Sequence, residues 1–300
     1  MNPPTVVGLG EILWDFLPSG PQLGGAPANF AYCSHLLGDR GIIASRVGND
    51  QLGQGIHEAL AKAGIPDQFV QSDDSQPTGT VQVQVDSAGQ PKFEITQPVA
   101  WDFLEWTKDW QDLAKSADAV CFGSLAQRSE RSRTTILKFL NAAPRNAILM
   151  FDVNLRQEFY SSEIICQSLQ CANAMKLNHD EVPLVKELLA VSERDDIMFC
   201  RHLLERFDLK LVCITRGANG SLLCDRDGVH AHAGHRVKVK NTVGAGDAFT
   251  AALLHEYLRQ RTLAEMNDTA NRMGAWVASH SGAMPKSPAP GLDRVLAAIG

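Results

Sequence analysis

The sequence predicts an α/β protein with a mostly parallel central sheet covered by helices on both faces. Unbroken apolar runs of strand length alternate with segments that show the apolar spacing of helices. Such strands are buried on both faces, and parallel neighbours need a crossover between them. The strand-like runs are 5–10, 42–47, 119–122, 147–153, 174–177 and 211–215, and the helix-like runs are 51–63, 131–142, 163–171, 180–189 and 196–207. We expect residues 1–300 to form one domain around this sheet.

One region departs from the alternation and predicts a small second sheet. Residues 78–85 and 92–96 alternate apolar and polar side chains around a turn-forming stretch at 86–90. We expect this hairpin to join the segment after Glu11, so that about 12–24 and 78–101 form a sheet projecting from the main body. Such a sheet could close over a ligand, clasp a second subunit in a homodimer, or only decorate the surface. Its long, apolar-faced strands favour a lid, or a lid that also clasps a second subunit.

The composition argues against a nucleic-acid or membrane partner. The chain carries 28 Lys and Arg against 34 Asp and Glu, a net charge of −6, and no basic stretch stands out. No apolar run reaches the roughly 18 residues of a membrane-spanning helix, and the first residues lack a signal-like pattern. The seven cysteines include no Cys-x-x-Cys pair. These features are typical of a cytoplasmic protein with reduced thiols.

The stretch Gly244-Ala245-Gly246-Asp247 places two glycines and a carboxylate at the start of an apolar helix. The first amides of a helix lack internal partners, and the helix dipole there favours negative charge. Glycines let a phosphate approach these amides closely. Asp247 would lie beside that phosphate, where it could accept a proton from an attacking hydroxyl. Taken alone, the same residues also fit a simple turn and N-cap.

Two upstream motifs could form the floor of a small-molecule pocket. Gly24 and Gly25 precede a helix expected to run to about residue 37, and Asn29 could reach sugar hydroxyls. Asp15 lies just past the first strand, where a carboxylate could accept two hydroxyl hydrogen bonds. The alternatives are a tight helix entry with a solvated Asn29, and a turn role for Asp15.

Polar residues also follow three further apolar strands. Ligands bind beyond the carboxyl ends of strands in open α/β sheets, although turns and helix caps select similar residues. The residues are Asn154 and Arg156 after the run at 147–153, Asn178 and Glu181 after the run at 174–177, and Thr215, Gly217 and Gly220 after the run at 211–215. Arg156 is the strongest candidate for a phosphate contact, because a guanidinium matches phosphate geometry.

In this order and spacing, the motifs resemble those of the PfkB/ribokinase family of carbohydrate kinases, most of all its fructokinase branch. The likeness covers nearly the whole chain. It also includes Gly8-x-Gly10-Glu11 and Asp152-x-Asn154-x-Arg156. The resemblance implies a ribokinase-like fold with a β-sheet lid over the sugar. It further implies transfer of the γ-phosphate of ATP to a primary hydroxyl of a free sugar, with magnesium as the metal.

The resemblance also implies site roles. Asp247 would be the base, with Gly244, Ala245, Gly246 and Arg156 around the transferring phosphate. The residues facing the sugar would be Asp15, Gly24, Gly25, Asn29, Trp101 and Asn154. Those near ATP would be Asn178, Thr215, Gly217, Gly220 and Asn271, with magnesium oriented through water by Asn178 and Glu181. The adenine is expected between residues 237–243 and the helix near 271–279.

Some alternatives stay open. Fructose is the leading acceptor, and ribose, a 2-keto-3-deoxy sugar acid or a nucleoside are the other candidates, because the motifs do not fix specificity. A binding protein that has lost catalysis is the alternative from another class. Related kinases commonly carry Asp at the position of Asn241, and Lys286 lies in the matching downstream loop, so a monovalent cation is doubtful. His230, His232 and His235 suggest a metal site or, preferably, a solvated edge strand.

Overall fold

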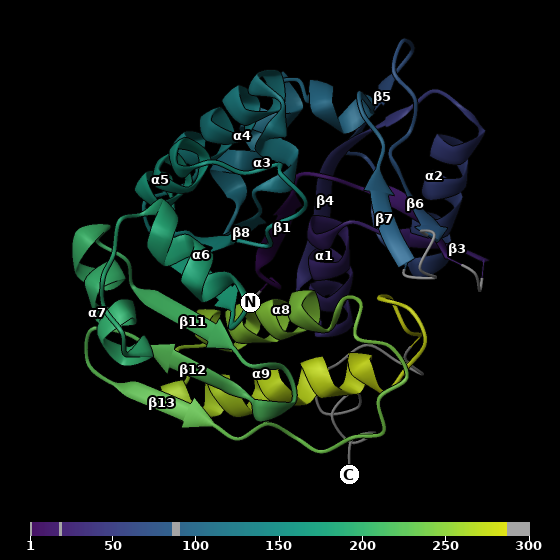
Figure 1. The fold of residues 1–300 in the computed structure, drawn as a ribbon. Coiled ribbons are helices and arrows are strands. Elements are labelled where there is room, and N and C mark those ends of the chain that lie inside the picture. The colour runs from purple at the N-terminus through teal and green to yellow at the C-terminus, as the bar shows by residue number, and fades with distance from the viewer. Residues whose placement is uncertain (1, 18–19, 86–90, 287–300) are drawn as a thin grey trace.

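The structure is a computed structural model that describes residues 2–17, 20–85 and 91–286. The turn expected at 86–90 lies outside the described residues. No helix in the described part of the chain combines the length and apolar character needed to span a membrane. Within these residues the chain forms a large sheet, a small sheet and two layers of helices (Figure 1).

The large sheet confirms the predicted architecture. Its strands lie in the order β13-β12-β11-β10-β9-β8-β1-β4-β5, and all are parallel from β11 to β5. β12 and β13 extend it as antiparallel strands. The bounds are β1 Thr5–Leu9, β4 Arg40–Gly48, β5 Val70–Asp73, β8 Ala119–Phe122, β9 Ile148–Asp152, β10 Ala174–Asn178, β11 Leu211–Thr215, β12 Ser221–Cys224 and β13 Val229–His232.

Alternate residues of the central strands enter two separate cores, one on each face of the sheet. In β9, Leu149 and Phe151 belong to one core, and Ile148 and Met150 to the other. The first core is covered by α3 (Lys108–Ser116), α4 (Glu130–Ala142), α5 (Ser162–Cys171), α6 (Glu181–Leu188) and α7 (Asp196–Arg206). The second is covered by α1 (Ala26–Leu36), α2 (Gln51–Ala63), α8 (Ala245–Leu258) and α9 (Leu263–Ala278). The central strands are largely apolar because helices cover both faces.

The small sheet has the order β3-β2-β6-β7, so the hairpin does join the segment after Glu11. Its strands are β2 (Leu13–Leu17), β3 (Gly20–Gly24), β6 (Thr80–Val85) and β7 (Pro91–Ile95), and β2 pairs with β6 in parallel. Val81 and Ile95 are cross-strand partners and both are buried. The sheet therefore has an apolar face directed to the body of the protein.

β5 and α3 are among the elements that have no counterpart in the predicted runs, and they are four and nine residues long. Most of the α3 sequence is polar, and Trp110 and Leu113 alone supply its large apolar contacts with the core. Tertiary packing rather than local pattern therefore decides these elements.

Candidate active site

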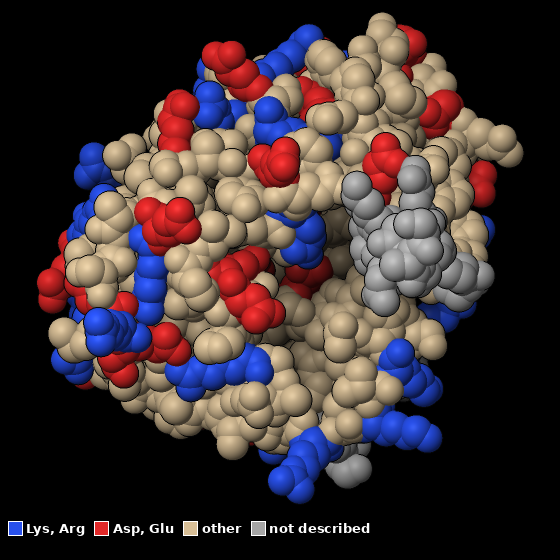
Figure 2. Space-filling view, viewed as in Figure 1, with Lys and Arg blue, Asp and Glu red and all other residues tan. Residues whose placement is uncertain are grey.

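A cavity of about 1250 Å³ lies at the carboxyl ends of β9, β10 and β11. Figure 2 shows this face hollowed, with acidic and basic side chains at the wall of the hollow. The small sheet contributes the lining residues Leu13, Asp15, Leu17, Val81 and Ile95. The chain between β13 and α8, together with α9, contributes Val237, Val239, Asn271, Ala275 and Ala278. The cavity is therefore large enough for two small-molecule ligands.

The glycine turn before α8 gives this cavity an open helix N-terminus. Gly244 is the N-cap with φ 78°, a left-handed conformation, and no side chain caps the helix. A Cβ on Gly244 would lie 2.5 Å from Cβ of Ala283, so no other residue fits there. The α8 N-terminus is thus free of side-chain caps and available to an anion. Gly244, Ala245, Gly246 and Asp247 all line the cavity, as the sequence predicts.

Asp247 has the setting of a general base. Its Oδ2 accepts a 2.8 Å hydrogen bond from Asn29 Nδ2 on α1. Burial and the charge of Asp152 raise the pKa of Asp247, whereas Lys176, the hydrogen bond from Asn29 and Arg156 lower it, and the net value is about 6. The carboxylate is therefore mostly ionised at neutral pH and can accept a proton there.

Asp15 and Asn29 supply acceptors on the small-sheet side. Both line the cavity, and Asn29 Oδ1 has no hydrogen-bond partner among the described residues. Burial raises the pKa of Asp15 to about 6, and Arg156 opposes that shift. Gly24 itself does not line the cavity. A Cβ there would lie 2.1 Å from Asp15 Oδ2, so this glycine makes room for the carboxylate. Gly25, with φ 103°, does line the cavity.

Trp101 is not among the residues that line the cavity. Its side chain is fully buried, and the Arg128 guanidinium lies 3.9 Å from its ring centroid. Arg128 also forms an ion pair with Asp102 and donates to the Thr96 carbonyl beyond β7. Trp101 and Arg128 therefore support the small sheet at the end of β7.

Asn178 and Glu181 form the reciprocal pair that the sequence predicts. Glu181 N donates to Asn178 Oδ1 at 2.9 Å, and Asn178 N donates to Glu181 Oε2 at 2.8 Å. Glu181 Oε1 accepts a third bond, 2.8 Å, from the Leu155 amide. Asn178 lines the cavity, whereas Glu181 is buried behind it. This arrangement fits a hydrated cation better than direct coordination by the carboxylate, because both oxygens already accept backbone hydrogen bonds.

The remaining predicted positions also line the cavity. They are Asn154, Arg156, Thr215, Gly217, Gly220 and Asn271. Thr215 ends β11, and a 3-10 helix at Gly217–Asn219 connects it to β12, so the predicted hairpin turn is present. The Asn271 amide donates 2.7 Å and 2.9 Å bonds to Ser221 Oγ and Asn267 Oδ1. Asn271 therefore also ties α9 to β12.

Two polar residues that lie behind the glycine turn belong to none of the predicted motifs. Lys176 lies in β10, lines the cavity and forms a buried ion pair with Asp152 at 3.0 Å. Thr250 on α8 donates a 2.9 Å bond to Asp152 Oδ2. A lysine inside an otherwise apolar strand was the available signal, since unpaired lysines are almost never buried.

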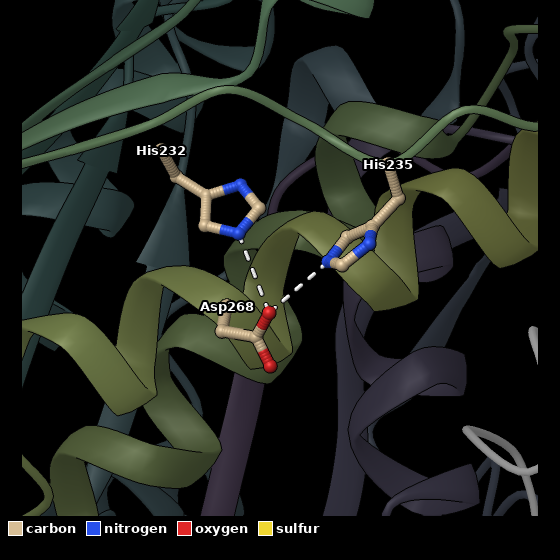
Figure 3. Close-up of side chains that lie close together, drawn as sticks. All are labelled: His232, His235 and Asp268. Carbon is tan, nitrogen blue, oxygen red and sulfur yellow. Dashed lines mark hydrogen bonds and ion pairs between the residues drawn. The ribbon is translucent and has the colours of Figure 1, made fainter.

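Two of the three histidines in the segment 230–235, His232 and His235, form a cluster with Asp268. In Figure 3, His232 and His235 point at Asp268 on α9, with Nε2 to Oδ1 distances of 3.3 Å and 3.1 Å. These atoms lie within metal-binding range of one another. The Gly234 amide, however, donates a 2.9 Å bond to His232 Nδ1, which places the remaining proton on Nε2, toward Asp268. The cluster is therefore a hydrogen-bonded clamp that holds the cavity-lining segment against α9.

A buried carboxylate beside an uncapped, glycine-lined helix N-terminus, at the edge of a doubly covered parallel sheet, is an arrangement that suits phosphoryl transfer to a small molecule. The chain belongs to the pfkB family of carbohydrate kinases, whose sequence pattern matches residues 21–290. It is a carbohydrate kinase that uses ATP.

Individual relatives agree with this assignment. The chain is 30% identical to a fructokinase of Escherichia coli over an alignment that covers 93% of this chain and 95% of that protein. A structure of a Vibrio cholerae O395 fructokinase double mutant with fructose, ADP and potassium bound is 25% identical, with a TM-score of 0.81 and coverage of 99% and 98%. A Xylella fastidiosa fructokinase with bound ATP shares the fold, with a TM-score of 0.85 at 22% identity and 98% coverage of each chain.

Proposed function

We propose that this carbohydrate kinase is a fructokinase, which transfers the γ-phosphate of ATP to a primary hydroxyl of fructose. The observation that carries the proposal is the hydrogen bond between Asn29 and Asp247. The bond holds Asn29, a candidate sugar-binding residue, beside Asp247, the proposed base, at the start of α8. The likeness to fructokinases over nearly the whole chain supports fructose as the acceptor.

The reaction follows from the positions of these groups. Asp247 accepts the proton of the attacking hydroxyl as the new O–P bond forms and the bond to ADP breaks. The amides at the start of α8 and the Arg156 guanidinium stabilise the charge on the transferring phosphoryl group. Magnesium, held through water near Asn178 and Glu181, would neutralise phosphate charge.

The charges on the small-sheet side favour a neutral sugar. Glu11 and Asp15 both line the cavity, and Arg156 is the basic residue whose charge acts on both carboxyl groups. An anionic acceptor such as a sugar acid would meet carboxylates that repel it. Asp15 and the unpartnered Asn29 Oδ1 instead suit hydroxyl donors.

We further propose that the small sheet acts as a lid over the sugar. Its buried partners Val81 and Ile95 line the cavity together with Asp15 of β2. An apolar cover that excludes water would limit hydrolysis of ATP.

A coupled assay of ADP release across acceptors tests the function. The panel contains fructose, ribose, 2-keto-3-deoxygluconate and a nucleoside, each with ATP and magnesium. We expect the highest kcat/KM for fructose. A higher value for another acceptor would replace fructose, and ligand-induced thermal shifts without any turnover would support the non-catalytic alternative.

A further inference from the structure

Lys176 lies beside the glycine turn at the start of α8, and the reaction proposed above assigns it no role. Its Nζ lies 3.0 Å from both carboxylate oxygens of Asp152, and the residue is only 6% exposed. A methyl group on Gly246 would lie 3.1 Å from the same nitrogen. The ammonium therefore lies directly beside the first turn of α8, where the transferring phosphoryl group is expected.

The ammonium keeps a donor for a ligand. An ammonium has three N–H groups, and the two Asp152 oxygens are the acceptors found for it among the described residues. Asp152 is itself held by Thr250, whose hydroxyl also contacts the Gly246 carbonyl at 3.0 Å. The pair is thus fixed to the same helix turn that would bind the phosphate.

Stability alone does not account for this ion pair. Burying two charges costs several kcal/mol per ion, and an apolar pair of similar volume is often at least as stable. Burial lowers the pKa of Lys176, but Asp152, Asp247 and Glu181 together raise it by more, so the side chain stays charged. The turn therefore keeps a permanent positive charge that its surroundings do not need for packing.

We propose that Lys176 is a further catalytic residue, which donates a hydrogen bond to the transferring phosphoryl group, with Asp152 and Thr250 as its positioning residues. The inference rests on phosphoryl transfer at the α8 turn, and it does not depend on which sugar is the acceptor. As the hydroxyl attacks and ADP leaves, negative charge spreads over the phosphoryl oxygens. The fixed ammonium stabilises that charge without moving.

A charge-neutral double variant separates catalysis from structure. Lys176→Met with Asp152→Asn removes both charges, so it leaves no unpaired buried ion. We expect an unchanged Tm and ADP affinity by calorimetry, with kcat lowered by about 10²-fold or more, as for the loss of an oxyanion donor. If Lys176 served only as the counter-ion of Asp152, the double variant would keep its kcat, and that result would overturn the proposal.

A second variant keeps the proposal testable if the double variant does not fold. Lys176→Arg retains the charge and the ion pair, but its longer planar group does not fit beside Gly246 in the same way. We expect kcat at least about tenfold lower with ADP affinity retained. Parental kcat in this variant would assign Lys176 to charge balance alone.

The proposed function has a separate check. The unmodified protein's activity on the acceptor panel decides the substrate, and both Lys176 tests use whichever acceptor turns over fastest. An inactive parent would contradict the proposed function itself and would leave an intact buried pair without a catalytic role.

Discussion

Asn29 donates a 2.8 Å hydrogen bond to Asp247, a residue 218 positions later in the chain. The bond joins the first turn of α1 to the first turn of α8, and neither helix has a side-chain cap at its N-terminus. One amide thereby orients the base, while its own oxygen remains without a partner among the described residues. The bond therefore links Asn29, which is proposed to face the sugar, to the glycine turn that would bind the phosphate.

Replacing the base tests its role directly. Asp247→Asn keeps the volume and can still contact Asn29, but it cannot accept a proton at neutral pH. We expect kcat to fall by at least about 10²-fold, the usual contribution of a positioned base. ADP affinity, measured by calorimetry, should be unchanged. Turnover within threefold of the parent would exclude Asp247 from this role.

The pH dependence of kcat/KM should report the pKa of Asp247 in the free enzyme. Since the base acts ionised and its pKa is about 6, kcat/KM should rise with pH through that value and level off above it. The bond from Asn29 favours the ionised form, so Asn29→Ala should move this limb to higher pH. A limb that stays in place in the variant would show that the bond does not tune the base.

Glu11 should make the protein less stable as pH rises. Burial chiefly raises its pKa from 4.5 to about 7, so the folded state binds the proton more tightly than the unfolded state. This contribution is fully present below pH 4.5 and is lost as pH rises through about 7. Glu11→Gln should therefore match the parent in acid and exceed it by up to about 3 kcal/mol at pH 8.

Denaturant unfolding of both proteins from pH 4 to pH 8 measures this difference. Burial and the backbone hydrogen bond to Ala26 act in opposite directions on the pKa of Glu11. A Gln variant that is less stable than the parent at every pH would mean that this hydrogen bond outweighs the burial of the charge.

The small sheet should influence the sugar more than the nucleotide. Ile95→Ala removes apolar lining from β7, and we expect the sugar KM to rise by about tenfold with little change for ATP. Val239→Ala is the matched control, because Val239 lines the cavity from the segment before α8 and is 56% exposed. It should raise the KM for ATP alone. Equal effects of Ile95→Ala on both substrates would argue against a lid.

Potassium should activate this enzyme weakly or not at all. Asn241 Oδ1 accepts a 2.9 Å bond from the Val243 amide, which caps the turn, and an amide is a weaker ligand for a hard cation than a carboxylate. Lys286 is exposed, so solvent screens its charge and it does not occupy the turn. A potassium titration at constant ionic strength, balanced with a bulky organic cation, measures the effect on kcat/KM.

The matched variant is Asn241→Asp, which restores the carboxylate common in related kinases. We expect it to gain a saturable potassium dependence without any change at Lys286. A severalfold activation of the parent by millimolar potassium would show that backbone carbonyls suffice for the ion.

The sequence predicts the large sheet and the glycine turns because both depend on local patterns. Apolar runs identify strands buried on two faces, and Gly244 adopts a left-handed conformation that other residues avoid. The position of the candidate site is also predictable from the sequence, because polar residues that follow parallel strands meet at one edge of the sheet.

Contacts between residues that are far apart in the chain could not be predicted from such local patterns. Trp101 follows the lid hairpin in sequence and was expected at the sugar, yet Arg128 covers its ring and the residue is fully buried. The partner of Asp152 is Lys176, which belongs to the next strand of the sheet. The clamp at Asp268 needs His235, which only the path of the chain after β13 brings beside His232. No local spacing encodes these three relationships.

The three backbone bonds around Glu181 have a consequence for evolution of this site. One carboxylate spans from the end of β10 to the loop after β9, because its oxygens bind the amides of Asn178 and Leu155. Arg156 follows Leu155 directly in the chain. The loop that carries Arg156 and the loop that begins at Asn178 are therefore held together by the Glu181 side chain. A shorter Asp at this position would reach only one of the two loops. Any substitution of Glu181 would therefore alter the positions of both loops together, so this one residue limits how either loop can change.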